Sequence, residues 1–438
     1  MYADVERVRF DAARHFLRVI QQQGRVLMAA ETNEQVAILL HHIQALAADL
    51  IGPGGTSRAD NGFALTMAGS DIAVGPGHYW VAGRLCEVEP GSAVSYLRQP
   101  DYDAPPVPLT GTHVVYLDVW ERHVSAAEDP GLVEVALAGP DSCTRTKQVW
   151  QIKIRPDVAN ATPNSVRNKW ASIEDALGRL AVGGRLSAAV GQVPRATTPC
   201  LAAPTSGYTR GENQLLRVEV HCGGPLTENP TVKWAWDNAS VAHRVRQVSG
   251  STVVLAAPPR DARSGLAKGT RVELQSDIQV RDGRPGVLTT VQGVEDDGDD
   301  YRVILAADPD CEFKEDERDE RERPRWALLR RWDHTGTKLV DGALELVEGK
   351  PMPLADGVEV TFAPPDDATR PWTYHAGDYW TIPVRVATGD VIWPRDAQDK
   401  PLARPPEGVE HGYTPLAVLT NGSLSDARMF VAPPTPST

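Results

Sequence analysis

The residues best suited to catalytic chemistry are two short pairs, Asp118 with Glu121 and Asp333 with His334. General acid–base catalysis needs two titratable groups with different pKa values in one cleft, and closeness in sequence does not supply that arrangement. In a strand, Asp118 and Glu121 point to opposite faces of the sheet. We therefore expect Glu121 to form an ion pair with Arg122 at the rim of the sheet, without a catalytic role.

Two other charged segments also have simpler readings. Arg330 to Asp333 predicts an Arg–Asp ion pair or a cation–π stack that holds a loop. The acidic run Glu295 to Asp300 lacks the spacing of a calcium loop and predicts the exposed tip of a hairpin. His41 and His42 are adjacent and so face different sides of a helix. Together these patterns predict no catalytic residue, no cofactor and no metal ligand.

Eleven tryptophans are many beside six phenylalanines, and they leave two functions open. Exposed tryptophan rings could stack on sugars, whereas rings buried in a sheet supply apolar area. Most lie inside apolar alternation, so we expect burial. A carbohydrate-binding module for cell-surface recognition remains an alternative, as does a glycan hydrolase, which needs two carboxylates in one groove. The candidates for sugar stacking are Trp120, Trp234, Trp236, Trp372 and Trp380.

The composition excludes several classes of protein. A net charge of −13 argues against nucleic-acid binding, because neutralising phosphates requires clustered Lys and Arg. Five scattered cysteines indicate neither a zinc site nor a disulfide framework. No apolar run reaches the ~20 residues that span a bilayer, and the start lacks a secretory pattern. We therefore expect assembly in the cytoplasm, without membrane insertion, into a particle that is released or acts outside the cell.

The amino-terminal region has the clearest pattern. Gly24 separates two short apolar runs, and a helix is then expected to begin with Thr32 or Asn33 as its cap and to stop at Gly52. Its apolar residues must be buried either against the chain's own sheets or against a neighbouring copy. We predict that this segment makes an assembly contact through Phe16, Val19, Leu27, Val36, Leu39, Leu40, Ile43 and Leu46.

The rest of the chain predicts a mainly β fold of several small sandwich or barrel subdomains after the N-terminal helix. Strands are expected at 133–137 and, at a sheet edge, at 416–419; a short helix is expected at 165–180. The predicted ranges are an attachment segment and helix at 1–56, a sandwich at 57–155, an insertion with the short helix at 156–205, a barrel at 206–310, a charged loop at 311–326, a β domain at 327–425 and a flexible tail at 426–438.

Several blocks of this sequence resemble an uncharacterised family of phage-tail-like proteins associated with contractile injection systems, whose members are sometimes fused to β-helical spikes. The resemblance spans nearly the whole chain. The blocks that carry it are Gln22–Val26 with Asn33–Gln35, Tyr116–Val124, Glu134–Leu137 with Gly139–Asp141, Arg145 with Val149–Gln151, Gly211–Leu215 with Arg217–His221, Lys233–Trp234 with Asp237–Asn238, Leu329–Asp333 and Gly377–Pro383.

The resemblance implies a structural role in a contractile tail-like particle, as a baseplate, spike-collar, cage or fibre-attachment protein that acts by assembly and is not an enzyme. The partners it implies are other tail, baseplate or spike proteins. Tail particles carry threefold and sixfold symmetry, so a homotrimer or a higher ring is expected. The family has no established catalytic residues to carry over to this chain.

Overall fold

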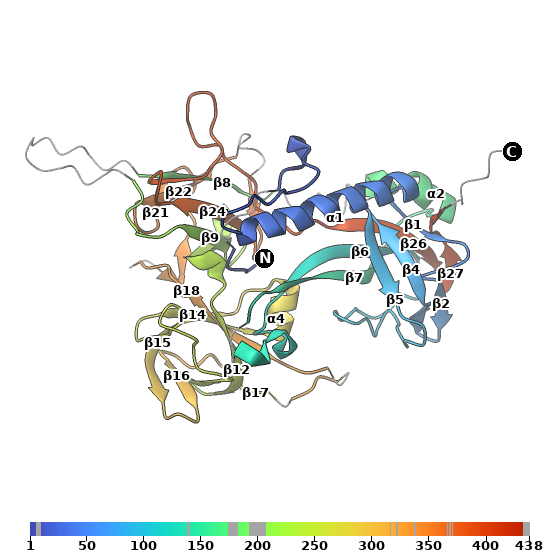
Figure 1. Cartoon of the computed structure of the whole chain (residues 1–438). Helices are drawn as coiled ribbons and strands as arrows, with labels where there is room; N and C mark the ends of the chain where they lie inside the picture. Colours follow the sequence, from blue (N-terminus) through green and yellow to red (C-terminus); the bar gives the residue numbers. More distant parts are fainter. Residues whose placement is uncertain are drawn as a thin grey trace, which may run out of the picture. The chain divides into compact units, whose positions relative to one another are not determined.

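The computed structural model shows a mainly β protein with an N-terminal helix, as predicted (Figure 1). Its elements form two compact units, which are described separately. Unit 1 comprises residues 1–8, 123–145 and 181–408, and unit 2 comprises residues 9–122, 146–180 and 409–438. The structure describes residues 1–5, 10–137, 141–173, 183–191, 207–315, 317–320, 323–336, 339–365, 367, 369 and 371–431.

Unit 2 holds three sheets. One has the order β28 (Phe430–Val431), β1 (Gly54–Ser57), β4 (Gly77–Val81) and β5 (Arg84–Val88). A second has the order β27 (Ser423–Asp426), β26 (Gly412–Thr420), β6 (Thr112–Val124) and β7 (Arg145–Arg155). The third is the hairpin of β2 (Leu65–Ala68) and β3 (Asp71–Val74). Their apolar faces share one core around Phe63, Tyr79, Leu117 and Ile152.

The helices of unit 2 differ from the prediction at their starts. α1 runs from Ala29 to Ile51, and its cap is Met28, which makes no side-chain capping bond. The prediction of Thr32 or Asn33 as the cap is wrong, because Ala29 and Ala30 are strong helix formers and extend the helix by one turn. Gly52 ends the helix as predicted, and Gly24 has the expected positive φ. A short 3-10 turn, η1, covers Ala12–Arg14.

The second predicted helix also begins earlier than expected. α2 runs from Pro163 to Asn168, behind a capping box made by Thr162 and Ser165. Helical residues resume at 170–173, while the predicted part at 174–180 lies outside the described residues. Trp170 and Val166 pack with Tyr116 in a small core of unit 2.

In unit 1, six antiparallel strands close a barrel, since β12 pairs with both β13 and β18. The order around the barrel is β12 (Ala242–Ser249), β13 (Thr252–Leu255), β16 (Tyr301–Leu305), β15 (Val287–Asp296), β14 (Arg271–Ser276) and β18 (Ala327–Trp332). β17 (Phe313–Lys314) adds to β12, and α4 (Asp277–Asp282) follows β14. Apolar side chains such as Val272, Leu274 and Leu329 form the barrel core.

Beside the barrel, unit 1 holds a six-stranded sheet and three smaller groups of elements. The sheet order is β19 (Leu339–Val340), β20 (Ala343–Glu345), β11 (Thr231–Ala235), β9 (Gln214–Val220), β24 (Tyr379–Arg385) and β25 (Asp390–Val391). The other elements are the sheet β21 (Pro351–Pro353), β22 (Val358–Ala363) and β8 (Arg185–Val190), the pair β10 (Gly224–Pro225) and β23 (Thr373–Tyr374), and the 3-10 turns η2 (Pro130–Leu132), η3 (Val135–Leu137), η4 (Leu226–Glu228) and η5 (Asp237–Ala239).

The barrel takes its strands from a different range than predicted. Of the strands expected in 206–310, β9 and β11 belong to the six-stranded sheet, and β18, from the range after the charged loop, closes the barrel. One face of that sheet packs against β8 and β22, with Leu216 and Phe362 among the side chains between them. This arrangement is a sandwich, so unit 1 holds both a sandwich and a barrel, although the sandwich was predicted at 57–155.

Four local predictions need comment. The strand expected at 133–137 is wrong, because Val133 forms only an isolated bridge with Asp141 and the residues from Val135 to Leu137 form the 3-10 turn η3. The strand expected at 416–419 is present within β26, but its expected edge position is wrong, because β26 pairs on both sides, with β6 and β27. Glu295 to Asp300 do form a hairpin tip, between β15 and β16. The charged segment 311–326, where described, includes the two residues of β17.

Candidate functional site

Helix α1 packs against its own unit through one narrow face. Ala30, Glu34 and Ile38 are its buried residues, spaced four apart so that they form a single line. The approach to the sheet is close at Gly83, in the turn between β4 and β5. A Cβ atom there would lie 2.2 Å from the carbonyl oxygen of Gln44, so only glycine fits.

Another face of α1 carries large apolar side chains that stay exposed, with exposed fractions between 45% and 71%. They recur every three or four residues, so they form one stripe along the helix. This stripe consists of Val36, Leu39, Leu40, Ile43, Leu46 and Leu50. The described sheets of its own unit therefore do not bury it.

The segment before α1, called the arm and defined as residues 10–28, adds to this stripe. Its exposed large side chains are Phe16, Leu17, Ile20, Val26 and Leu27. The arm is tied to the helix where the Val19 N–H donates to Gln35 Oε1 over 2.8 Å, and Val19 itself is only half-buried. We call the eleven exposed side chains of arm and helix the apolar surface.

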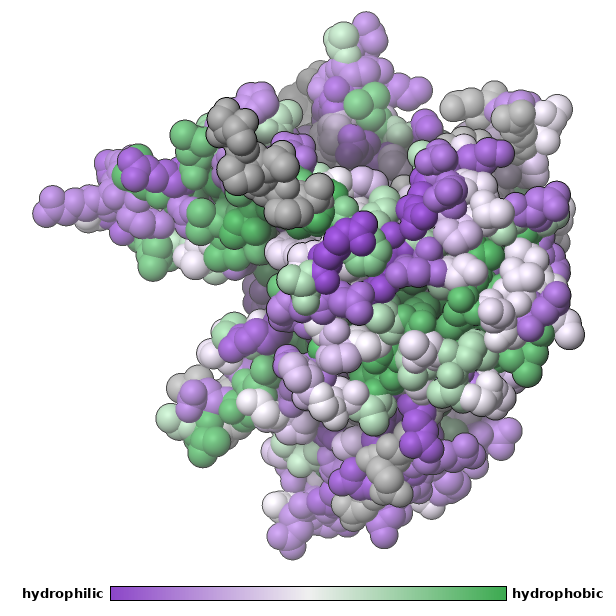
Figure 2. All heavy atoms as spheres, turned by 90° about the vertical axis from the view of Figure 1, so that its right-hand side faces the viewer, coloured by the Kyte–Doolittle hydropathy of each residue, from purple (hydrophilic) through white to green (hydrophobic). Residues whose placement is uncertain are grey.

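Concentration, more than exposure, distinguishes this surface. Single exposed apolar residues are ordinary, and Figure 2 shows hydrophobic groups among hydrophilic ones on the face it presents. Yet among the described residues, eleven of the twenty-two exposed large hydrophobic side chains fall between positions 16 and 50. Such a concentration is typical of an interaction site.

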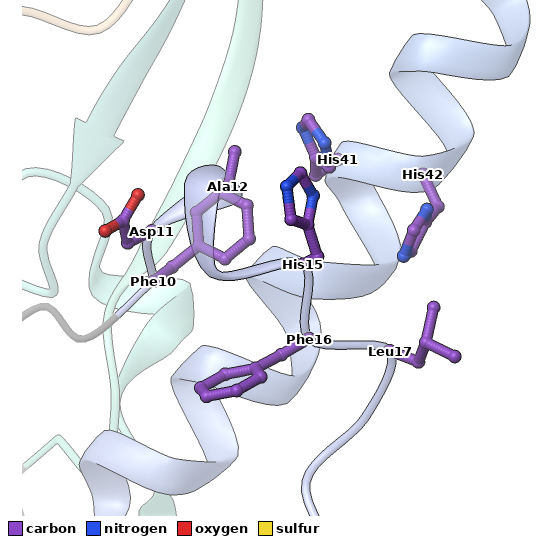
Figure 3. Close-up of a pocket in the computed structure, with 8 residues that line it drawn as sticks. All are labelled: Phe10, Asp11, Ala12, His15, Phe16, Leu17, His41 and His42. Carbon is purple, nitrogen blue, oxygen red and sulfur yellow. The ribbon is translucent and has the colours of Figure 1, made fainter.

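A pocket of about 200 Å³ lies between the arm and α1 (Figure 3). The rings of Phe10 and His41 are 5.5 Å apart, and the Arg14 guanidinium stacks over Phe16 at 4.3 Å. Asp11 points away from both helix histidines in Figure 3, and its carboxylate accepts a hydrogen bond from the Ala13 N–H. The pocket thus presents rings and no acid–base pair. Its lining residues are Phe10, Asp11, Ala12, His15, Phe16, Leu17, His41 and His42.

The first acid–base candidate is not brought together. Asp118 is buried in unit 2, where its two oxygens lie 2.6 Å from Lys153 Nζ and 2.6 Å from His411 Nδ1, whereas Glu121 is exposed. The His411 ring is stacked with Tyr413. Sequence reasoning missed His411 because it lies 293 residues from Asp118. The contact comes from the pairing of β6 with β26.

The second candidate holds loops in place. Asp333 pairs with Arg331 at 3.3 Å and accepts a hydrogen bond from the Trp236 N–H, and burial raises the pKa of its carboxyl. His334 Nε2 lies 2.8 Å from the Gly342 carbonyl oxygen, and burial lowers the pKa of its ring to about 4. The expected Arg–Asp ion pair is therefore present.

A buried charged cluster in unit 1 was not predicted. Lys233 Nζ lies 2.7 Å from Glu273 Oε2 and 3.2 Å from Glu219 Oε1, and Arg217 Nε donates to Glu219 Oε2 over 2.6 Å. The Tyr2 hydroxyl also donates to Glu219, at 2.8 Å. Although burial opposes ionisation, Lys233 and Arg217 lower the pKa of Glu219 to about 2. Only the alternation of polar and apolar residues in these strands could have indicated the cluster.

Neither alternative function receives a site from these groups. All eleven tryptophans are described, and none is exposed; the five sugar-stacking candidates are all buried. Glu219 and Glu273, two carboxylates that share Lys233, are buried and ion-paired, so they do not line a groove. Among the described residues, no group of three or more His, Cys, Asp or Glu could hold a metal ion.

The fold and the apolar surface thus define a mainly β protein with an exposed apolar helix. A family model described as DUF6519, a family of unknown function, matches residues 1–179 and 171–427, and the chain belongs to this family. No characterised protein and no solved structure matched it. In the described part of the chain, no helix is long and apolar enough to span a bilayer.

Proposed function

We propose that this protein is a structural component that acts by assembly, and that the apolar surface is its contact with further copies of itself. The observation that carries the proposal is the gathering of eleven exposed apolar side chains on the arm and α1. Leaving such a surface in water costs about 25 cal/mol per Å² of apolar area, and a partner removes that cost. The helix has 23 residues and is about 35 Å long, which is enough for a stable contact.

Charge favours a protein partner over a lipid or a nucleic acid. α1 contains no Lys or Arg and carries Glu31, Glu34 and Asp49. The arm adds Arg14, Arg18 and Arg25 beside Asp11, so the acidic side chains of arm and helix outnumber the basic ones and the region is not basic. Interfacial membrane helices are usually rich in basic residues that attract anionic lipids, and nucleic-acid surfaces are basic for the same electrostatic reason. The stripe itself has no charged residue with which to select a partner by sign. A second copy presents the same uncharged stripe and therefore fits it.

The setting we propose is a contractile tail-like particle, as a baseplate, spike-collar, cage or fibre-attachment protein. This setting rests on the sequence blocks that resemble tail-associated proteins. Other tail, baseplate or spike proteins would then be further partners, and a trimer or higher ring is the expected state. No step of catalysis is required, because the proposed mechanism is assembly without turnover.

The first test is the mass of the purified chain by light scattering. We expect an oligomer for the natural sequence and a monomer for the double variant Leu40→Asp with Leu46→Asp, because charges in the contact must be desolvated. The matched control is Leu109→Asp with Val409→Asp, which places the same charges at exposed apolar positions of unit 2 outside the surface. A monomeric natural chain, or an oligomer that survives Leu40→Asp with Leu46→Asp, would refute the proposed contact.

The setting has its own test, an affinity pull-down of the tagged chain from its native cells followed by mass spectrometry. Sheath, tube or spike proteins in the eluate would support the particle, provided that the Leu40→Asp, Leu46→Asp variant loses them. An eluate that contains the oligomer alone would keep the self-contact and reject the particle.

A further inference from the structure

The buried charged cluster of unit 1 lies between the six-stranded sheet and the outer wall of the barrel. On β11, Lys233 is the direct cross-strand neighbour of Glu219 on β9. Glu273 comes from β14 of the barrel, between Val272 and Leu274, which both point into the barrel core. Because side chains alternate along a strand, Glu273 points outward, toward the sheet.

Lys233, Glu273 and Glu219 carry the chemical groups of a nucleophile, an electrophile and a proton carrier, in that order, at short distances from one another. The Lys233 amine lies 2.7 Å from the carboxyl group of Glu273 and 3.2 Å from that of Glu219. None of these side chains is more than 3% exposed. The amine and the Glu273 carboxyl are thus held in contact with water excluded, which is the arrangement that raises the rate of an intramolecular reaction.

Glu273 is also held by two N–H donors, one at each oxygen. The backbone N–H of Gly286 donates to Oε1 over 2.8 Å, and Trp332 Nε1–H donates to Oε2 over 2.8 Å. Donors fixed in this way stabilise the negative charge that develops on oxygen when a carboxyl carbon becomes tetrahedral. The Trp332 ring lies beneath the amine, with Nζ 4.4 Å from its centroid.

The charge balance favours loss of one ion pair. Burying an ion pair costs desolvation energy that its attraction only partly repays. An amide between Lys233 and Glu273 would remove both charges from the interior. The negative charge of Glu219 would stay neutralised, because Arg217 remains ion-paired with it, with Nε 2.6 Å from Oε2.

We propose that Lys233 and Glu273 condense to an isopeptide bond, with Glu219 as the proton carrier. A proton passes from the Lys233 ammonium to the Glu273 carboxylate, which leaves a neutral amine and a carboxylic acid. The amine lone pair attacks Cδ of Glu273, Glu219 takes a proton from Nζ and returns it to the departing oxygen, and one water leaves. The step needs no oxidant, reductant or co-reactant, since one Nζ–Cδ bond forms as one Cδ–O bond breaks.

The bond would join the six-stranded sheet to the barrel covalently. Lys233 and Glu273 are 40 residues apart, so the link would also close a loop in the unfolded chain. Cross-links of that span lower the entropy of the unfolded state and stabilise the fold. This modification goes beyond the proposed assembly, and it does not depend on it.

The test is the intact mass of the purified full-length chain under denaturing conditions. We expect a mass lower than the sequence mass by one water, and a digest that contains the Lys233 and Glu273 peptides linked together. The variant Lys233→Met should show its full sequence mass. Glu219→Gln should reduce the linked fraction at least tenfold in chains analysed at the same age, because it removes the proton carrier.

Two results would overturn the proposal. One is the full sequence mass in freshly purified chain that persists after prolonged incubation. The other is a loss of water that maps elsewhere, such as to an Asp–Gly step like Asp282–Gly283, where cyclisation of the aspartate also releases one water. Equal linkage in the Glu219→Gln variant would overturn the role of Glu219.

Discussion

The apolar surface of unit 2 and the buried charged cluster of unit 1 invert the usual distribution of side chains in opposite ways. In the first, eleven large hydrophobic side chains lie in water; in the second, ionised groups such as Glu273 and Lys233 lie out of it. The charged cluster is satisfied within one chain, since each member has partners at hydrogen-bond distance. The side chains of the apolar surface, by contrast, remain exposed to water.

The two features therefore act on different properties: the cluster on the stability of the fold, and the apolar surface on association between chains. A buried charge without a partner destabilises the fold by several kcal/mol, so the pairing within the cluster is part of the stability of unit 1. An exposed apolar stripe leaves the folded chain intact and changes only how copies associate. Perturbing the cluster should therefore act on unfolding, and perturbing the surface should act on association.

Acidification should have the largest effect, and it should act on unit 1. Burial lowers the pKa of His221 and of His334 from 6.5 to about 4. Both rings are neutral in the fold but gain a proton when unfolded, so stability falls as the pH drops from 6.5 to 4, by roughly 3 kcal/mol for each ring. Glu219, with its pKa of about 2, adds a further loss between pH 4.5 and 2.

Hydrogen exchange read peptide by peptide along an acid titration would check this prediction. Barrel and sheet peptides of unit 1 should lose protection above pH 4, before those of β6 and β26. Protection that falls in both units together, and only below pH 4, would contradict it.

Removing the lysine should have the next largest effect. Lys233→Met leaves the Glu273 carboxylate buried without its cation and also prevents the proposed bond, so it should lower the free energy of unfolding by at least about 3–5 kcal/mol. Arg284→Met is the matched control, because its ion pair with Asp282 is exposed and should change stability by less than about 1 kcal/mol. Urea unfolding of both variants gives the comparison, and equal losses would mean that burial of the pair contributes nothing.

Two adjacent helix positions should separate the two faces of α1. Ile38→Ala removes a buried side chain and should cost about 3 kcal/mol, whereas Leu39→Ala removes an exposed one and should stay within about 0.5 kcal/mol. Unfolding measured at concentrations where the chain is monomeric isolates this effect from association. A large loss for Leu39→Ala in the monomer would mean that the stripe is covered within the chain.

The smallest effect is expected at the turn under the helix. Gly83→Ala combines a positive φ with a collision against the Gln44 carbonyl, whereas Gly69→Ala has a similar φ and open space around it. The first should therefore be less stable than the second by about 1–2 kcal/mol, which is the cost of overpacking. Thermal unfolding of the two variants supplies the difference, and equal values would contradict the close approach of α1.

Local patterns explain which features could be predicted from the sequence. The 3.6-residue period between Val36 and Leu50 is a property of neighbouring residues, so the helix and its stripe were predicted, and Gly52 marked its end. Short runs are ambiguous: the segment 133–137 has the composition of a strand, but its residues from Val135 to Leu137 form a 3-10 turn. Similarly, the local sequence does not show that 416–419 lies inside a sheet. Its inner position comes from pairing with both β6 and β27, and β6 is distant in sequence.

The sites depend on contacts that sequence spacing does not encode. Asp118 meets His411 only because β6 pairs with β26, and Lys233 meets Glu273 only because the sheet lies against the barrel wall. The alternation of polar and apolar residues in β14 indicates that Glu273 faces away from the barrel core. It does not indicate whether that face meets water or another sheet.

The pairing of β6 with β26 also sets an order of events during synthesis. The barrel can close once Trp332 has left the ribosome, because its strands lie between Ala242 and Trp332. The apolar strand β6 has no such local partner on its β26 side until Gly412 emerges, nearly 300 residues later. At 5–20 residues per second, this wait lasts about 15–60 seconds. For that interval the β26 side of β6 exposes unpaired backbone groups and apolar side chains. Nascent chains of this protein should therefore depend on chaperones mainly for unit 2.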